Sequence, residues 1–184
     1  MTSPPFRALL HSSKPGLVKA NTLTAVAGYF FAGNNFSLTR LVGVTFGTAF
    51  IVAAGCSLNN YFDRRLDATM ERTRSRPTAN GTISPKHVLL FSASFFIIGV
   101  FVLATLTNAL CTVVGIVAFI SYAFIYTYLK RKTALAVAFG TLPGAAGLVT
   151  GYLAGVNLIT IDVVFLFLIM FFWQIAHFYA IGLR

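Results

Sequence analysis

Long apolar runs separated by short polar connections form the pattern of this chain. Each run approaches the roughly 20 residues that a helix needs to cross the hydrocarbon of a bilayer. The pattern predicts an all-α protein, a polytopic transmembrane helical bundle organised as a single membrane domain over residues 1–184. The six predicted spans cover about residues 15–32, 41–62, 87–106, 109–129, 134–154 and 159–183.

Composition and charge agree with a membrane protein. The chain is 57% hydrophobic and 10% charged, whereas a soluble domain carries about a quarter charged residues. Its net charge of +10 does not indicate a nucleic-acid partner, because the basic residues gather in alternate connections, as the positive-inside rule describes. One set of connections, together with both ends of the chain, holds thirteen of the 14 Lys and Arg residues: Arg7, Lys14, Lys19, Arg64, Arg65, Arg72, Arg74, Arg76, Lys86, Lys130, Arg131, Lys132 and Arg184.

The opposite connections hold Arg40 alone. This asymmetry predicts that both ends of the chain and the long connection from Asp63 to Lys86 lie in the cytoplasm. The N-terminal residues contain no apolar stretch long enough for a cleaved signal peptide, so a bacterial inner membrane is the simplest location.

A polar stretch from Asn59 to Pro77 interrupts the pattern and holds three of the four acidic residues. Asp63, Asp67 and Glu71 follow one another at intervals of four, and Asn59 extends the row backward. Side chains at this spacing lie along one face of a helix. Two carboxylates and an amide oxygen are ligands that Mg²⁺ accepts. The sequence therefore predicts a magnesium site at Asn59, Asp63 and Asp67, which would also be the catalytic residues.

Five arginines accompany the acidic row, at positions 64, 65, 72, 74 and 76. Arginine binds phosphate oxygens while a metal bridges others, so the combination favours a diphosphate ligand, with the arginine run from Arg72 to Arg76 as a clamp. Lys130 and Arg131 form a second basic group on the same side. Two alternatives stay open: acids that pair with arginines in a solvated turn, and basic residues that only set the topology. Ionisable groups at the membrane boundary nevertheless favour a functional role.

Polar and aromatic side chains inside the apolar runs indicate a cavity between the helices. His177 lies with Gln174 and Tyr179 near the end of the last run. This grouping is typical of a polar pocket with a haem-facing ligand, or of a hydrogen-bonded core histidine. The aromatic residues at positions 122, 124, 126 and 128 cannot all share one helical face, but a subset could line a cavity and stabilise a carbocation.

The fifth run differs from its neighbours because glycine recurs in it at intervals of three or four. Such a face allows close helix packing, and Pro143 predicts a kink or a local opening of the helix. Cys56 and Cys111 are interpreted as small buried residues. The glycines are Gly140, Gly144, Gly147, Gly151 and Gly155.

The polar motif and several longer stretches resemble a known family. The spacing NxxxDxxxD at Asn59, Asp63 and Asp67 is similar to the first aspartate motif of the UbiA intramembrane prenyltransferase superfamily. Within it, an ordered set of stretches resembles the protohaem IX farnesyltransferases, also called haem O synthases. These stretches extend over nearly the whole chain: SKPGLVKANTLTAVAGYF, AAGCSLNNYFDRRLD, MERTRSRP, GTISP, SYAFIYTYLKRKT, GAAGLVTGY and WQIAHFYAI.

The resemblance implies a helical bundle around a lateral, membrane-embedded cavity. Farnesyl diphosphate would bind through Mg²⁺, and its farnesyl group would move to a vinyl group of haem b to give haem O. His177 would lie on the haem side, and a haem A synthase or a terminal-oxidase assembly factor would be a partner besides the lipid bilayer. The residues that the resemblance assigns to the diphosphate and its polar mouth are Arg72, Lys130, Arg131, Lys14 and Asn21.

The sequence departs from the family pattern in one respect. The family carries a second aspartate motif after the sixth span and about nine spans in total, each of roughly 20 residues. Here Asp162 is the one acid after Glu71, and the charge pattern puts it on the side opposite the arginines. We therefore expect a fragment of a longer protein that is inactive by itself.

Two other functions stay open at this point. One is prenyl transfer to an aromatic quinone precursor, and the other is a non-enzymatic role as a membrane transporter or assembly factor. Transporters often show paired broken helices in two repeated halves, whereas only the fifth run here looks broken.

Overall fold

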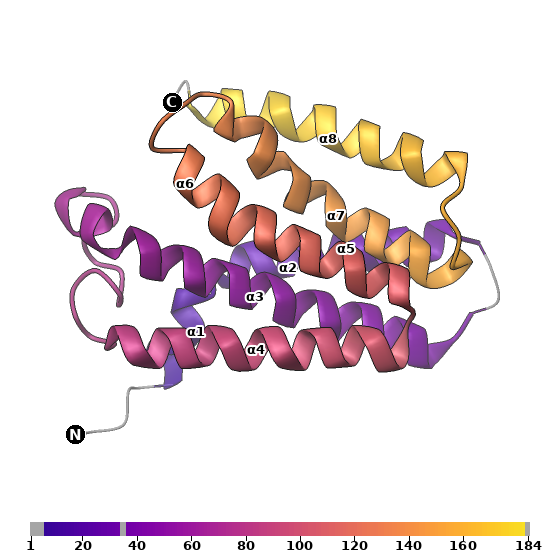
Figure 1. Ribbon diagram of the computed structural model, residues 1–184, viewed down its shortest axis with the longest axis horizontal. Coiled ribbons are helices and arrows are strands. Elements are labelled where there is room, and N and C mark those ends of the chain that lie inside the picture. Colours follow the sequence, from indigo (N-terminus) through magenta and orange to yellow (C-terminus); the bar gives the residue numbers. More distant parts are fainter. Residues whose placement is uncertain (1–5, 34–35, 183–184) are drawn as a thin grey trace.

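A computed structural model describes residues 6–33 and 36–182, and within these ranges all regular secondary structure is helical (Figure 1). The predicted all-α class is confirmed. The segments α5, η1 and α6 follow one another directly, and η1 is a π-helical stretch. The elements are α1 (Phe6–Ser12), α2 (Pro15–Phe31), α3 (Leu38–Thr69), α4 (Pro85–Leu106), α5 (Ala109–Ile120), η1 (Ser121–Tyr126), α6 (Thr127–Leu129), α7 (Ala136–Val156) and α8 (Ile161–Gly182).

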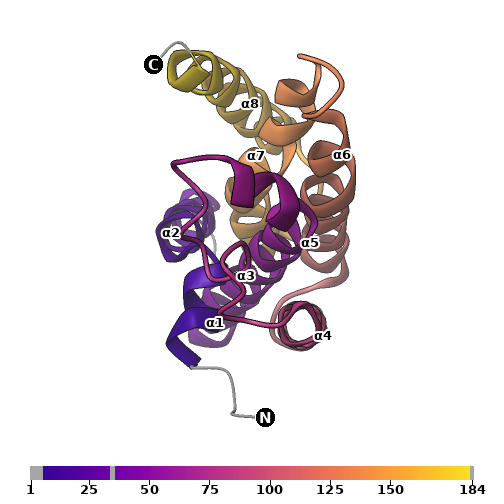
Figure 2. The ribbon, with the colours of Figure 1, turned by 90° about the vertical axis from the view of Figure 1, so that its left-hand side faces the viewer.

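The long helices lie side by side, with α3 and α7 in the middle of the bundle. Helix α3 packs against α4 and α2, and α7 packs against α2, α5 and α8. Helices α4 and α8 form opposite edges, which the turned view separates clearly (Figure 2). Buried apolar side chains such as Val44, Leu103 and Leu153 fill the space between the helices.

Local sequence signals explain where several helices begin. The side chains of Ser37, Ser84 and Asn108 accept hydrogen bonds from backbone N–H groups in the first turns of α3, α4 and α5. Such caps satisfy donors that the helix itself leaves unpaired. Pro15 and Pro85 occupy first-turn positions, where the missing N–H costs nothing.

The predicted glycine face of the fifth run is confirmed, because it allows α7 to approach α2 very closely. A Cβ atom added to Gly151 would lie 1.8 Å from the carbonyl oxygen of Ala25, and one added to Gly28 would lie 2.1 Å from that of Leu148. Only glycine fits such distances between backbones. Helix α7 continues through Pro143 without an interruption, so the predicted local opening is not observed.

The span count differs from the prediction of six. Within residues 6–33 and 36–182, five helices are long and apolar enough to cross a membrane: α3, α4, the continuous helical segment from Ala109 to Leu129, α7 and α8. Helix α2 has 17 residues, which at about 1.5 Å per residue is shorter than the roughly 30 Å hydrocarbon layer. The chain is thus a multi-pass membrane protein. Helix α2 packs against α7 and α3 through one face, where Ala25, Gly28 and Tyr29 are buried, and its other face is exposed.

The connections alternate between two ends of the bundle (Figure 1). We call the end that contains the C-terminus of α3, residues 70–84, α6 and the start of α7 the cationic end. The opposite end contains residues 107–108 and 157–160 and the start of α3. Helix α3 extends to Thr69, so Asp63 and Asp67 lie on a helix, as their spacing predicted. The predicted end of this span near residue 62, which began the connection at Asp63, is wrong. The Lys and Arg side chains that the structure describes lie at or near the cationic end, except Arg40 at the start of α3.

Candidate active site

The predicted row of polar residues occupies the last three turns of α3. Asn59, Asp63 and Asp67 are 1%, 4% and 4% exposed, so each is buried although two of them carry charge. Glu71 lies beyond the end of the helix and is exposed. The row therefore ends at Asp67, because the helical spacing that would align Glu71 with it no longer applies.

Asp63 is paired with the first two of the three basic residues that follow α6. Lys130 Nζ contacts Asp63 Oδ2, and Arg131 donates to Asp63 Oδ1 at 2.9 Å. Arg131 also donates to the carbonyl oxygen of Phe62 at 3.0 Å, which fixes its position beside α3. Lys130 and Arg131 therefore lie at the acidic row, as a role in ligand binding requires and a role in topology alone would not.

Asp67 is paired with Arg76, and not with Arg72, which the family resemblance assigned to the diphosphate. Arg76 donates from one guanidinium nitrogen to both carboxylate oxygens of Asp67, at 2.9 and 2.8 Å. Arg72 is exposed, and no hydrogen bond or ion pair of its side chain is found among the described residues. The chain turns back after Met70, where Arg74 N donates to the Met70 carbonyl oxygen at 2.9 Å, and this reversal brings residue 76 to the helix end.

Asn59 is held by two neighbours from other elements. Lys14 Nζ donates to Asn59 Oδ1 at 2.8 Å, and Asn59 Nδ2 donates to Thr127 Oγ1 at 2.8 Å. Lys14 also lies 3.4 Å from the Tyr122 hydroxyl. The predicted link between Lys14 and the polar site is therefore present in the structure.

The backbone and the charge of Lys14 are both unusual. Its φ of 54° is in the left-handed region, which costs a residue with a Cβ on the order of 1–2 kcal/mol. Burial lowers the pKa of Lys14, and Arg76 and Lys130 lower it further, while Cys56 and Asp63 act in the opposite direction. A strained and partly desolvated cation of this kind is typical of a functional site.

The cationic side chains outnumber the carboxylates at this end of α3. Lys14, Arg76, Lys130 and Arg131 surround the two carboxylates of Asp63 and Asp67, so four positive charges face two negative ones. The two carboxylates are buried, whereas the side chains of Arg76, Lys130 and Arg131 are 26%, 24% and 45% exposed. The excess of two positive charges is therefore partly exposed to solvent, where it attracts anions. The arrangement suits a polyanion.

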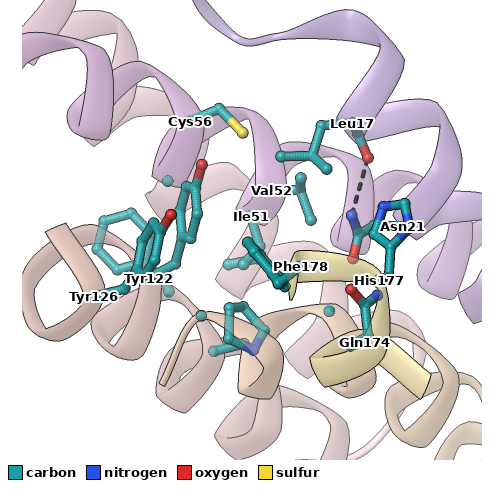
Figure 3. A pocket seen from close by; sticks show the side chains of 16 residues that line it. Leu17, Asn21, Ile51, Val52, Cys56, Tyr122, Tyr126, Gln174, His177 and Phe178 are labelled. Atoms are coloured by element: carbon teal, nitrogen blue, oxygen red, sulfur yellow. Dashed lines mark hydrogen bonds between the residues drawn. The ribbon is translucent and has the colours of Figure 1, made fainter. Parts of the chain in front are cut away.

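A cavity of about 290 Å³ lies beside the acidic row. Tyr122 and Tyr126 form one wall as a stacked pair, with ring centroids 5.6 Å apart and an angle of 10° between the planes (Figure 3). Apolar residues from α2, α3, α5, α7 and α8, among them Ile51, Val52 and Phe178, provide much of the rest. A predominantly apolar lining with a few polar groups is characteristic of ligand pockets.

The prediction that a subset of the four aromatic residues lines a cavity is confirmed. Tyr122 and Tyr126 do so, whereas Phe124 and Tyr128 are exposed and do not belong to the lining. The π-helical turn lies between residues 121 and 126, and Lys130 Nζ lies 5.4 Å from the centroid of the Tyr126 ring. The stacked pair thus connects the cavity to the cationic cluster.

Polar groups from α2 and α8 form another part of the cavity wall. Asn21, Gln174 and His177 all line it (Figure 3). The His177 ring also stacks on Trp173, with centroids 5.3 Å apart. Asn21 donates to the Leu17 carbonyl oxygen at 3.0 Å, so it lies in the cavity wall, and no contact with Asp63 or Asp67 is found for its described side chain.

The donor set fits a hard divalent cation. Two carboxylates and one amide oxygen on one helix supply the oxygen ligands that Mg²⁺ prefers, and among the described residues no third His, Cys, Asp or Glu side chain joins the two carboxylates. Asp162 accepts a hydrogen bond from the Tyr152 hydroxyl at 3.2 Å, at the opposite end of the bundle. Its predicted separation from the arginines is confirmed.

Three contributions to the site were not predicted from the sequence. Arg76 replaces Arg72 at the acidic row, Thr127 binds the Asn59 amide, and Cys56 lines the cavity. The sequence signals were weak: Arg76 is one of five similar arginines, and Thr127 stands among apolar and aromatic neighbours. Cys56 is fully buried as predicted, as is Cys111.

Comparisons with known protein sequences indicate one protein family. The profile of the UbiA prenyltransferase family matches residues 21–184. The chain is 35% identical over 181 residues to the protoheme IX farnesyltransferase of Aliivibrio salmonicida, covering 97% of this chain and 62% of that protein. It is 40% identical to protoheme IX farnesyltransferase 1 of Bacillus subtilis, covering 94% of this chain and 56% of that protein. The chain thus spans less than two thirds of the length of these relatives.

Solved structures share the fold. A UbiA homologue from Archaeoglobus fulgidus bound to GPP and Mg²⁺ superimposes with a TM-score of 0.79 at 20% identity, over 93% of this chain and 61% of that one. A digeranylgeranylglyceryl phosphate synthase gives a TM-score of 0.81 at 20% identity, over 92% of this chain and 60% of that one. At this identity the likeness establishes the arrangement of the helices.

Proposed function

Because the chain belongs to the UbiA prenyltransferase family, we propose that it provides the diphosphate-binding site of a Mg²⁺-dependent protohaem IX farnesyltransferase. The whole protein would transfer the farnesyl group of farnesyl diphosphate to a vinyl group of haem b and so produce haem O. The observation that carries the proposal is the acidic row at the end of α3, which lies between four cationic side chains and an apolar cavity. The names of the relatives support haem b as the acceptor.

The diphosphate would lie at the cationic end. Asn59, Asp63 and Asp67 would hold Mg²⁺, which when bound supplies positive charge to the diphosphate oxygens. Lys130 and Arg131 now bind the oxygens of Asp63. On substrate binding they would exchange these oxygens for phosphate oxygens, because a diphosphate carries more negative charge than one carboxylate.

Heterolysis of an allylic diphosphate needs charge stabilisation and no nucleophilic side chain. The bond between the first farnesyl carbon and the diphosphate oxygen breaks, and the electron pair goes to the oxygen, where Lys14, Lys130 and Arg131 stabilise the negative charge. The farnesyl cation would lie against the ring faces of Tyr122 and Tyr126. A vinyl carbon of haem b then attacks the cation, and water captures the resulting carbocation and releases a proton, which gives the hydroxyethylfarnesyl side chain.

The size of the cavity suggests where each substrate binds. A volume of about 290 Å³ is at the lower limit of ligand pockets, which usually measure about 300–1,000 Å³. We place the farnesyl chain in it, and haem b at its edge beside Asn21 and His177, since His177 is exposed there. The cationic end would face the cytoplasm of a bacterial cell, by the positive-inside rule, and a haem A synthase would receive the product.

The test is an acceptor comparison in membranes from cells that express the whole gene product. Farnesyl diphosphate and Mg²⁺ are supplied with haem b or with 4-hydroxybenzoate, and products are identified by liquid chromatography and mass spectrometry. We expect haem O and no prenylated benzoate, and about 100-fold less haem O from Asp63→Asn at an equal amount of protein. Prenylation of the benzoate alone would end the haem assignment, and full activity of Asp63→Asn would remove the metal site from the proposal.

A further inference from the structure

Thr127 occupies a special position between the acidic row and the aromatic wall. It is the first residue after the π-helical turn, and it is 4% exposed. Its hydroxyl contacts two groups from different parts of the site: the Asn59 amide on α3 and the Tyr122 carbonyl oxygen on η1. π-Helical turns inside α-helices occur frequently at functional sites.

The hydrogen bonds of Thr127 have defined directions. Its single hydroxyl proton is donated to the Tyr122 carbonyl oxygen at 2.9 Å, because a carbonyl can only accept. The hydroxyl oxygen must therefore accept from Asn59, which is consistent with the 2.8 Å distance to Asn59 Nδ2. In a regular helix a threonine hydroxyl binds the carbonyl three or four residues earlier, whereas this one reaches five residues back across the π turn.

The orientation of the Asn59 amide follows from these directions. Lys14 carries only donors, so the atom that it meets at 2.8 Å must be the amide oxygen. Thr127 requires the amide nitrogen on the other side. Both neighbours thus demand the same orientation, in which Asn59 Oδ1 faces the charged cluster.

We propose that Thr127 is a positioning residue that keeps the oxygen of Asn59 turned toward the metal and diphosphate. This inference rests on the proposed function, since it gives Thr127 a role through a proposed Mg²⁺ ligand. Groups that orient a metal ligand typically change metal affinity by 10–100-fold when they are removed. Thr127 also ties that ligand to the Tyr122 backbone, so the metal site and the aromatic wall keep one relative position.

Thr127→Val is the direct test, because valine keeps the shape and removes the hydroxyl. The purified whole gene product in detergent is titrated with Mn²⁺ in the presence of inorganic pyrophosphate, and bound Mn²⁺ is measured by electron paramagnetic resonance. We expect the apparent Kd for Mn²⁺ to rise 10–100-fold in Thr127→Val, and to stay within about 3-fold of the parent in Thr127→Ser. Thr127→Ala gives the same comparison if the valine variant does not fold.

Thr141→Val is the matched control. Thr141 is also fully buried, but its hydroxyl donates to the Ala138 carbonyl oxygen of its own helix at 2.7 Å and contacts no site residue. Its Mn²⁺ affinity should equal that of the parent. Equal affinity of Thr127→Val and the parent, or a serine variant as weak as the valine one, would overturn the inference.

A double-mutant comparison shows whether Thr127 acts through Asn59. In an Asn59→Ala background, Thr127→Val should cause no further loss of Mn²⁺ affinity, because the group that it positions is gone. If Thr127→Val lowers Mn²⁺ affinity as much in this background as in the parent, the inference is overturned, and Thr127 only stabilises the local structure. If the parent and Asn59→Ala bind Mn²⁺ and pyrophosphate equally weakly, the proposed metal site itself is wrong, and the role of Thr127 is refuted with it.

Discussion

The two ends of the bundle both contain polar networks that connect helices, but the networks differ in charge. At the cationic end, four basic side chains meet two buried carboxylates beside a cavity. At the opposite end, the Tyr152 hydroxyl lies 3.2 Å from both Thr160 Oγ1 and Asp162 Oδ2, and Asn108 donates to the Leu153 carbonyl oxygen at 2.8 Å. In the opposite network, neutral groups and the exposed carboxylate of Asp162 are hydrogen-bonded to one another.

The charged network has the features of a ligand-binding site, whereas the opposite network has those of hydrogen bonds that hold helices together. Neutral hydrogen bonds between helices satisfy polar groups and contribute about 0.5–1.5 kcal/mol each. An excess of positive charge around buried carboxylates attracts anions. The cationic end can therefore hold an anionic ligand, whereas the network described at the opposite end carries no positive charge.

We expect the largest difference between the two ends when a carboxylate is neutralised at each end and the farnesyl-transfer rates are compared. Asp67→Asn removes an oxygen ligand and the partner of Arg76, so we expect farnesyl transfer to fall about 100-fold or more. Asp162→Asn keeps the size of an exposed side chain at the opposite end and should change the rate by less than about 3-fold. Initial rates in membranes, normalised to the amount of protein, check both. Equal losses in the two variants would mean that the ends do not differ in function.

The second largest difference should be between Arg76 and Arg72, measured as the KM for farnesyl diphosphate. Arg76→Ala removes the guanidinium that contacts both oxygens of Asp67, and we expect the KM for farnesyl diphosphate to rise about 10-fold or more. Arg72→Ala removes an exposed side chain and should alter KM by about 2-fold at most. A larger effect at Arg72 than at Arg76 would support Arg72 as the diphosphate-binding arginine, as the family resemblance implied.

The aromatic wall should have a smaller effect, on turnover. Tyr126→Leu removes a ring that faces the cavity, and a cation–π contribution of about 0.5–2 kcal/mol corresponds to a loss of roughly 2–30-fold in kcat. Tyr128→Leu changes an exposed ring outside the lining and serves as the control. An equal kcat in the two variants would contradict stabilisation of a carbocation by Tyr126.

The opposite end should respond in stability and hardly in activity. Tyr152→Phe removes the hydroxyl that lies between Thr160 and Asp162. We expect a loss of about 0.5–1.5 kcal/mol in the free energy of unfolding and an unchanged KM for farnesyl diphosphate. Thermal unfolding in detergent, together with the kinetic assay, measures both. A raised KM would show that the opposite network reaches the active site.

Helical periodicity made the acidic row predictable, and tertiary contacts made its partners unpredictable. The interval of four between Asn59, Asp63 and Asp67 is a local property of one helix, so the sequence was sufficient. The pairing of Asp67 with Arg76 depends on how the chain reverses after Met70, and no spacing rule selects it from five arginines. The spans were also predictable as apolar runs. Whether the first run is long enough to cross the membrane depends on the exact end of α2, which apolar runs alone do not define.

The π-helical turn shows a second limit of sequence analysis. A regular helix would have given Tyr122, Tyr126 and Thr127 other directions, and no residue pattern announced the change at residues 121–126. The cavity wall and the contact between Thr127 and Asn59 both depend on this local register. His177 lines the cavity, as a polar residue in an apolar run indicated, and its place on the haem side stays a prediction.

The most direct measurement is a structure of the protein with Mn²⁺ and farnesyl thiodiphosphate, an analogue that ionises slowly, with the metal located by anomalous scattering. We expect Mn²⁺ at about 2.1 Å from oxygens of Asn59, Asp63 and Asp67, the farnesyl chain in the cavity along the wall of Tyr122 and Tyr126, and Lys130 and Arg131 moved from Asp63 onto the diphosphate. A metal bound elsewhere, with Asp63 still paired to Lys130, would contradict the account.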